Sequence, residues 1–128
     1  MKTKTLHDGT PVRTGDVVLV ALDPTLGSEM RKTRPCLLLE AGGSPLNLVI
    51  ALPITDNTPP RSSPLFVPIA DLSLAGLTKP SAVDCYQLRT VSLERIGKRL
   101  GSAGSETLDT VRSRLAVLLD IGEEHLLR

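Results

Sequence analysis

The hydrophobic pattern changes its period near residue 101, and this change limits the fold more than any other feature. The apolar runs before that point span residues 17–22, 35–39, 48–54, 65–69, 81–88 and 95–100. Short runs of this kind, separated by turn-like segments, are typical of β-strands. Beyond it, Leu108, Val111, Leu115 and Leu118 recur at three- and four-residue steps, as on one helix face. The pattern predicts a mainly β fold with one C-terminal helix.

The strands differ in how apolar they are. Runs 35–39 and 48–54 are almost continuously apolar, which favours strands covered on both faces or central in a small barrel. Pro64 and Pro68 place run 65–69 at an edge, because proline cannot donate to a strand ladder. We expect the helix to lie on the open side of the barrel.

The ends of the helix and the connections carry their own signals. Ser105 is the expected N-cap, with Glu106 and Asp109 in the first turn, and Gly122 is expected to end the helix. Residues 56–64 contain three prolines and should form an exposed loop. Residues 71–77 should form a short helical turn.

Composition indicates one globular domain, residues 1–128, with a core of about 13–122. Phe66 and Tyr86 are the only aromatic residues, so the core should be aliphatic. The net charge is +1, so any phosphate binding requires a local cluster of cations. The N-terminus lacks a signal peptide pattern, and no run approaches the roughly 20 apolar residues of a membrane span. Cys36 and Cys85 lie in apolar runs and should be buried thiols of a reduced, cytoplasmic protein.

Several kinds of catalytic site find no support in the sequence. His7 and His125 lie in opposite terminal segments, which disfavours a two-histidine ribonuclease mechanism. The cysteines and histidines lack metal-ligand spacing, and no glycine-rich phosphate loop opens a helix. We therefore expect no metal and no cofactor.

The segment 27–35 is the strongest candidate for chemistry, because it carries three cations and one carboxylate. Arg34 precedes Pro35, which favours an extended backbone, and it stands where the loop enters a strand. A guanidinium group held at that position can bind a phosphate group. Thr55 ends another apolar run, where threonine is usually a local hydrogen-bonding residue. Position alone leaves functional and structural roles equally open for Arg34.

The order of four elements resembles the MazF/PemK toxins of bacterial toxin–antitoxin systems. The first matching element comprises Gly15-Asp16 with the following strand, Asp23-Pro24-Thr25-Leu26-Gly27-Ser28-Glu29, and Arg34-Pro35 with its strand. The other three are Pro53-Ile54-Thr55, Gln87-Leu88-Arg89-Thr90, and Arg95 to Gly101 with the closing helix. The match extends from about Gly15 to the C-terminal helix. Four elements in order, at compatible spacing, make it specific.

The resemblance implies an SH3-like small β-barrel that forms a homodimer and is blocked by a cognate antitoxin protein. It also implies a metal-independent endoribonuclease that cuts single-stranded RNA, including mRNA, at short sequences. In that family the residues matching Arg34 and Thr55 form the active site. The 2′-hydroxyl attacks the adjacent phosphate and leaves a 2′,3′-cyclic phosphate and a 5′-hydroxyl.

RNA contacts are expected from the family elements and from the loops beside them. The expected RNA-binding residues are Ser28, Glu29, Arg31, Lys32, Asn57, Tyr86, Gln87 and Arg89. Asp56 and Arg61 are further loop groups that could read the sequence. Tyr86 stands where some members have an acidic residue, so no carboxylate base is available there, and Met30 replaces a frequent glutamine. Tyr86 fits a base-stacking role and ordinary packing equally well.

Three other interpretations remain open. A CcdB-type gyrase poison would share the architecture without needing RNA-cleaving residues. A catalytically inactive barrel would only bind an antitoxin. An SH3-like adaptor unrelated to toxins is the least compatible with the ordered match.

Overall fold

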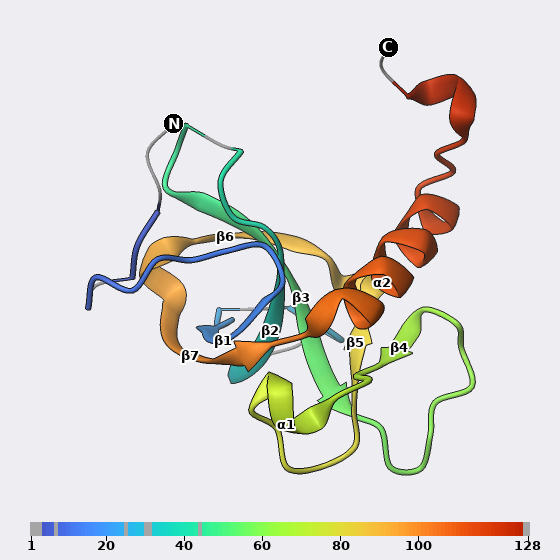
Figure 1. Ribbon diagram of the computed structural model, residues 1–128, viewed down its shortest axis with the longest axis horizontal. Helices are drawn as coiled ribbons and strands as arrows, with labels where there is room; N and C mark the ends of the chain where they lie inside the picture. Colours follow the sequence, from blue (N-terminus) through green and yellow to red (C-terminus); the bar gives the residue numbers. More distant parts are fainter. Residues whose placement is uncertain (1–3, 7, 25, 30–31, 44, 127–128) are drawn as a thin grey trace.

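The computed structural model describes residues 4–6, 8–24, 26–29, 32–43 and 45–126 (Figure 1). Its strands are β1 (Asp16–Ala21), β2 (Thr33–Glu40), β3 (Leu48–Asp56), β4 (Phe66–Pro68), β5 (Ser81–Asp84), β6 (Arg89–Ser92) and β7 (Ile96–Ser102). The helices are α1 (Leu72–Ala75) and α2 (Gly104–Leu118), with 3₁₀ turns η1 (Cys85–Gln87), η2 (Leu93–Arg95) and η3 (Glu123–His125). The prediction of a mainly β fold with a C-terminal helix is confirmed.

The strands form one antiparallel sheet in the order β4-β5-β3-β2-β1-β7. β3 is central: β2 lies on one side of it, and β6 and β5 lie on the other, along successive parts of its length. β4 is at one end of this order, as the prolines predicted. The sheet bends into a barrel-like form without closing (Figure 1).

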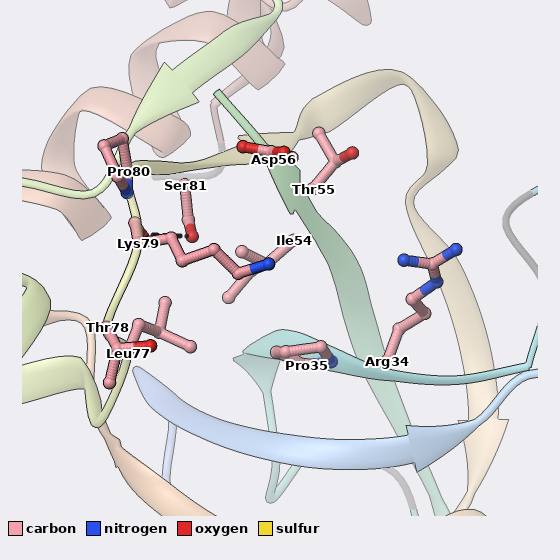
Figure 2. Close-up of a pocket in the computed structure, with 10 residues that line it drawn as sticks. All are labelled: Arg34, Pro35, Ile54, Thr55, Asp56, Leu77, Thr78, Lys79, Pro80 and Ser81. Atoms are coloured by element: carbon pink, nitrogen blue, oxygen red, sulfur yellow. Dashed lines mark hydrogen bonds between the residues drawn. The ribbon is translucent and has the colours of Figure 1, made fainter. Parts of the chain in front are cut away.

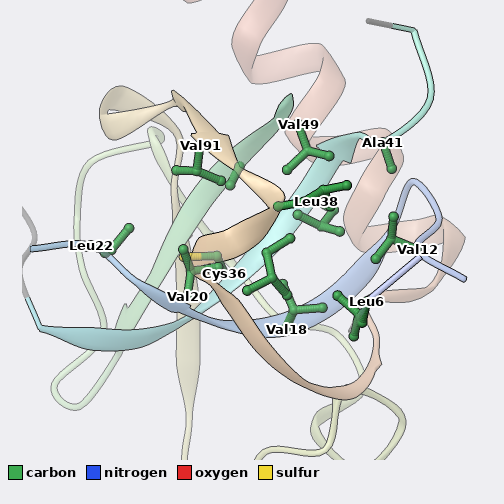
Figure 3. Packing of buried hydrophobic residues seen from close by; sticks show 13 residues of the cluster. Leu6, Val12, Val18, Val20, Leu22, Cys36, Leu38, Ala41, Val49 and Val91 are labelled. Carbon is green, nitrogen blue, oxygen red and sulfur yellow. The ribbon is translucent and has the colours of Figure 1, made fainter. Parts of the chain in front are cut away.

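Both faces of the central strands are buried, which explains their continuous apolar runs. One cluster contains Val18, Cys36, Leu38 and Val49 inside the bent sheet (Figure 3). The alternate residues of the same strands, such as Leu37 and Leu52, belong to a second cluster that α2 covers. Both clusters are aliphatic, as predicted.

Helix α2 presents the predicted face to the second cluster, but its ends differ from expectation. Val111 and Leu115 are buried there. Ser105 is not the N-cap: the helix begins at Gly104, whose N–H donates to the Ser102 Oγ at 3.2 Å. It ends at Leu118, well before Gly122. Asp120, with φ 55°, supplies the left-handed residue after the helix that had been assigned to Gly122.

The predicted strand over residues 81–88 is divided. β5 ends at Asp84, whose side chain accepts the Tyr86 N–H at 3.1 Å and so starts η1. This local bond competes with the strand ladder. Cys85 therefore lies in the turn and not in a strand, although it is buried as expected. The chain resumes as β6, a strand that the apolar pattern did not reveal.

The predictions for residues 71–77, for residues 56–64 and for Cys36 are confirmed. Residues 71–77 contain α1, capped by Asp71, whose side chain accepts the Leu74 N–H at 3.0 Å. Residues 56–64 form a largely exposed loop. Cys36 is fully buried in β2. Within the described part of the chain, no helix is long and apolar enough to cross a membrane.

Candidate active site

The ends of two neighbouring strands bring Arg34 and Thr55 to one hollow. β2 and β3 are antiparallel, and Cys36 pairs with Pro53. Arg34 comes two residues before Cys36 in β2, and Thr55 comes two residues after Pro53 in β3. The same register, continued to these positions, sets Arg34 opposite Thr55 on the same face of the sheet. Both side chains line a hollow of about 210 Å³ (Figure 2). The structure therefore places together the two residues that the sequence could relate only through a family resemblance.

The hollow has a polar and an apolar part. Its lining consists of Arg34, Pro35, Ile54, Thr55, Asp56, Leu77, Thr78, Lys79, Pro80 and Ser81. The cations Arg34 and Lys79 stand against one carboxylate, that of Asp56. One Asp56 oxygen accepts the Thr58 N–H at 3.1 Å, which closes a turn in the loop. The surroundings of Thr55 therefore favour an anion.

A second guanidinium reaches Thr55 from the loop that follows β3. Arg61 donates from Nη2 to the Thr55 Oγ1 at 3.3 Å and from Nε to the Asp56 carbonyl oxygen at 3.2 Å. Its guanidinium carbon lies 4.7 Å from the centroid of the Phe66 ring, a cation–π distance. The sequence had suggested Arg61 only as a loop group for reading RNA. Its three contacts hold it beside the threonine hydroxyl.

Asn57, an expected RNA-binding residue, holds this loop in place. Its side-chain oxygen accepts the Arg61 backbone N–H at 2.9 Å. Its own backbone N–H donates to the Pro80 carbonyl oxygen at 3.0 Å. Asn57 thus ties the loop that carries Arg61 to the segment that carries Pro80, and it does not line the hollow.

Lys79 is the member of the hollow that sequence reasoning missed. Its ammonium group points into the space between the strand ends (Figure 2). A signal was present: Lys79-Pro80 stands immediately before β5, as Arg34-Pro35 stands at the start of β2. In both places a cation precedes proline at a strand entry, which restricts its backbone.

A second hollow, of about 590 Å³, gathers most of the expected RNA-binding residues. Ser28, Glu29, Tyr86, Gln87, Leu88, Arg89 and Thr90 line it. The Tyr86 side chain is 71% exposed, so it does not serve as core packing within this chain. It is available to stack against a base.

The buried carboxylate of Asp84 organises this second hollow. Asp84 is 4% exposed and accepts the Tyr86 N–H and, at 2.9 Å, the Gln87 Nε2 group. These bonds fix the turn from which Tyr86 and Gln87 project. A carboxylate therefore lies close to Tyr86, but it has a supporting role.

The loop before β2 contributes less than expected. Glu29 lines the second hollow and also accepts the Leu26 N–H. Lys32 is exposed and lies in neither hollow; its backbone adopts φ 66°, and its carbonyl accepts the Leu22 N–H at 2.9 Å. Arg31 lies outside the described residues.

The two thiols are not suited to nucleophilic chemistry. Burial raises the pKa of Cys36 to about 12, partly offset by the charge of Arg89. Burial, with a contribution from the Asp84 charge, raises the pKa of Cys85 to about 11. Because the thiolate is the reactive form, both remain inert at neutral pH. In the described part of the chain, no three His, Cys, Asp or Glu side chains are grouped to hold a metal ion.

Comparison with known proteins gives a consistent result. Residues 13–119 match the family described as PemK-like, MazF-like toxin of type II toxin-antitoxin system. The chain is 33% identical over 110 residues to Endoribonuclease PemK of Escherichia coli, covering 82% of this chain and 80% of that protein. It is 30% identical over 112 residues to Endoribonuclease EndoA of Bacillus subtilis, covering 84% and 94%.

Solved structures share the fold. MazF from Deinococcus radiodurans superposes with a TM-score of 0.71 at 22% identity, covering 94% of this chain and all of that one. A MazE–MazF structure from the same organism gives a TM-score of 0.67 at 25% identity, covering 85% and 96%. The barrel-like sheet with its C-terminal helix is thus the arrangement found in MazF proteins.

Proposed function

The chain belongs to the family of PemK-like and MazF-like toxins of type II toxin–antitoxin systems, and from this premise we propose that it is an endoribonuclease that cuts single-stranded RNA at the Arg34–Thr55 hollow. Its relatives in Escherichia coli and Bacillus subtilis are named endoribonucleases. The observation that carries the assignment of the site is the convergence of Arg34 and Thr55, from separate strands, on one cation-rich hollow.

The proposed reaction uses the RNA's own 2′-hydroxyl. A bond forms between O2′ and phosphorus, the bond from phosphorus to O5′ breaks, and the 2′-hydroxyl proton passes to solvent. The departing O5′ takes a proton from water, which leaves a 2′,3′-cyclic phosphate and a 5′-hydroxyl. No metal ion enters this scheme.

The side chains act on the charge that develops during the reaction. Negative charge builds up on the phosphate oxygens, and the Arg34 guanidinium can donate two parallel hydrogen bonds to them. The guanidinium group of arginine stays protonated in proteins, so the role proposed for Arg34 is electrostatic. Arg61 donates to the Thr55 oxygen, so that the hydroxyl hydrogen remains available for the phosphate. Arg61 is therefore a positioning residue.

The second hollow fits bases of the RNA beyond the site of the cut. Exposed Tyr86 offers an aromatic face for stacking, and Gln87 and Arg89 offer hydrogen-bond donors. Ser28 and Glu29 border the same space. We place the sequence readout here, with Asn57 acting through the loop that it anchors.

Partner proteins form part of the proposal. The Deinococcus radiodurans relative has been solved as a MazE–MazF structure, and we propose that a cognate antitoxin likewise blocks this chain. We also propose a homodimer as the working unit. Val117, Leu119, Ile121 and Leu126 are exposed at the C-terminal end, an apolar surface of the kind that protein partners cover.

The test is cleavage of a long RNA of known sequence, with the 5′ ends of the fragments mapped in the presence and absence of EDTA. We expect cuts at a recurring short motif, unaffected by EDTA, with 5′-hydroxyl ends. A single 2′-deoxy substitution at a cut position should abolish that cut alone. Cuts that require a divalent ion would contradict the mechanism. The absence of cuts would redirect attention to gyrase or to antitoxin binding alone.

A further inference from the structure

Lys79 is a cation that faces the proposed active site. It lies between α1 and β5, and its ammonium group points into the hollow that it shares with Arg34 and Thr55 (Figure 2). Among the described residues, none accepts a hydrogen bond from that ammonium group or forms an ion pair with it. The charge is therefore available to a ligand.

Two hydrogen bonds hold the backbone at Lys79 and Pro80. The Lys79 carbonyl accepts the Ser81 hydroxyl at 2.8 Å, and the Pro80 carbonyl accepts the Asn57 N–H at 3.0 Å. Pro80 also restricts the Lys79 backbone to extended conformations. The side chain can move, but the position from which it extends is set by the same Asn57 that anchors the Arg61 loop.

The shape and lining of the hollow suit one unit of a polymer. Its volume of about 210 Å³ is smaller than the roughly 300–1,000 Å³ typical of sites for drug-sized molecules. Ile54, Leu77 and Pro80 supply an apolar wall against which a sugar or base can lie. Among the described residues of the lining, Asp56 is the one carboxylate, and a backbone N–H already engages it.

We propose that this hollow is a subsite for the nucleotide next to the cleaved bond, in which Lys79 binds the neighbouring phosphodiester while Arg34 and Thr55 act on the scissile one. The proposal rests on the proposed ribonuclease function. Lysine binds phosphate as a point charge without fixed orientation, which suits holding the chain more than stabilising a transition state. Lys79 is thus a binding residue, and its loss should weaken RNA binding more than it slows the cleavage step.

The test compares RNA binding by the wild type, Lys79→Met, Lys79→Arg and Lys98→Met as a function of salt. Lys98 is an exposed lysine on β7 that lines neither hollow, so its variant controls for the loss of one positive charge. The ligand is a 2′-O-methyl oligonucleotide carrying a mapped cut site, which cannot be cleaved. Fluorescence anisotropy at about 50 to 200 mM salt gives the slope of log Kd against log salt, and each phosphate contact on a single strand contributes about 0.7 to it.

We expect Lys79→Met to reduce that slope by about 0.7, with Lys79→Arg and Lys98→Met close to the wild type. On cleavable RNA, Lys79→Met should raise KM and leave kcat within about twofold. An unchanged slope in Lys79→Met would overturn the subsite. A wild type that neither binds nor cuts RNA would overturn the proposed function as well, whereas a cutting wild type with an unchanged Lys79→Met slope would overturn the subsite alone.

Discussion

Replacing Arg61 by alanine tests how the hydroxyl of Thr55 is held. The change removes the 3.3 Å hydrogen bond to Thr55 and the cation–π contact with Phe66. A hydrogen bond to a charged group contributes about 1.5–3 kcal/mol, and the exposure of Arg61 places it at the lower end. Since about 1.4 kcal/mol corresponds to tenfold in rate, kcat should fall about tenfold. Loss of the exposed cation–π contact should cost only about 0.5–1 kcal/mol of stability.

The assay is a double-mutant cycle on a fluorogenic oligonucleotide that carries a mapped cut site. Its members are the wild type, Arg61→Ala, Thr55→Val and the double variant. If Arg61 acts through the hydroxyl, Arg61→Ala should cost less than about twofold once Thr55 is valine. Arg112→Ala, which removes an exposed arginine on α2, should leave kcat unchanged. A tenfold loss from Arg61→Ala in both Thr55 backgrounds would refute the coupling.

Three further predictions concern stability. Asp84→Ala removes the cap of η1 and the partner of Gln87, so urea denaturation should show a loss of about 2–3 kcal/mol; a loss below about 1 kcal/mol would contradict the bonding described. Burial raises the pKa of Cys36 from its ordinary 9.0 to about 12, so its contribution to stability is fully present below pH 9 and is lost as pH rises toward 12. The free energy of unfolding should fall with a slope on the order of 1.4 kcal/mol per pH unit. Urea titrations between pH 8 and 10 should show a smaller slope for Cys36→Ala than for the wild type. A Cβ at Gly101 would lie 2.2 Å from the Leu74 carbonyl oxygen, so Gly101→Ala should cost about 3 kcal/mol and lower the Tm, and an unchanged Tm would show that this close approach is absent.

The sequence predicted those parts of the fold in which burial alone sets the pattern. The central strands β2 and β3 are apolar on both faces because each face contacts a separate cluster. The face of α2 was recognisable for the same reason: Val111 and Leu115 recur at helical spacing and are buried.

The errors arose where a single hydrogen bond or one glycine decides the local structure. Asp84 interrupts an apolar run by capping η1, although the residue types of segment 81–88 are compatible with one strand. Gly104, with φ 81°, turns the chain into α2 one residue before Ser105, which was the expected N-cap because serine is a preferred capping residue. Such effects depend on geometry that hydrophobic periodicity does not encode.

The candidate site was also predictable only in part. Arg34 and Thr55 were related by a family pattern. The β2–β3 register supplies the physical reason, because its continuation two residues beyond the Cys36–Pro53 pair sets them opposite each other. Arg61 reaches the site from the loop that follows β3, and Lys79 from the segment before β5, so their positions depend on the path of these loops. For Lys79, the cation before proline at a strand entry was a usable signal.

The central claim is that Arg34 stabilises the charge on the cleaved phosphate without a metal ion. Single-turnover cleavage of one mapped oligonucleotide in EDTA, by the wild type and by Arg34→Ala purified in the same way, tests it most directly. Removing one donor to a developing oxyanion typically costs about 100- to 1,000-fold, so the variant should cut that much more slowly with an unchanged Tm. A folded Arg34→Ala protein that cuts the same bond at the wild-type rate would contradict the claim.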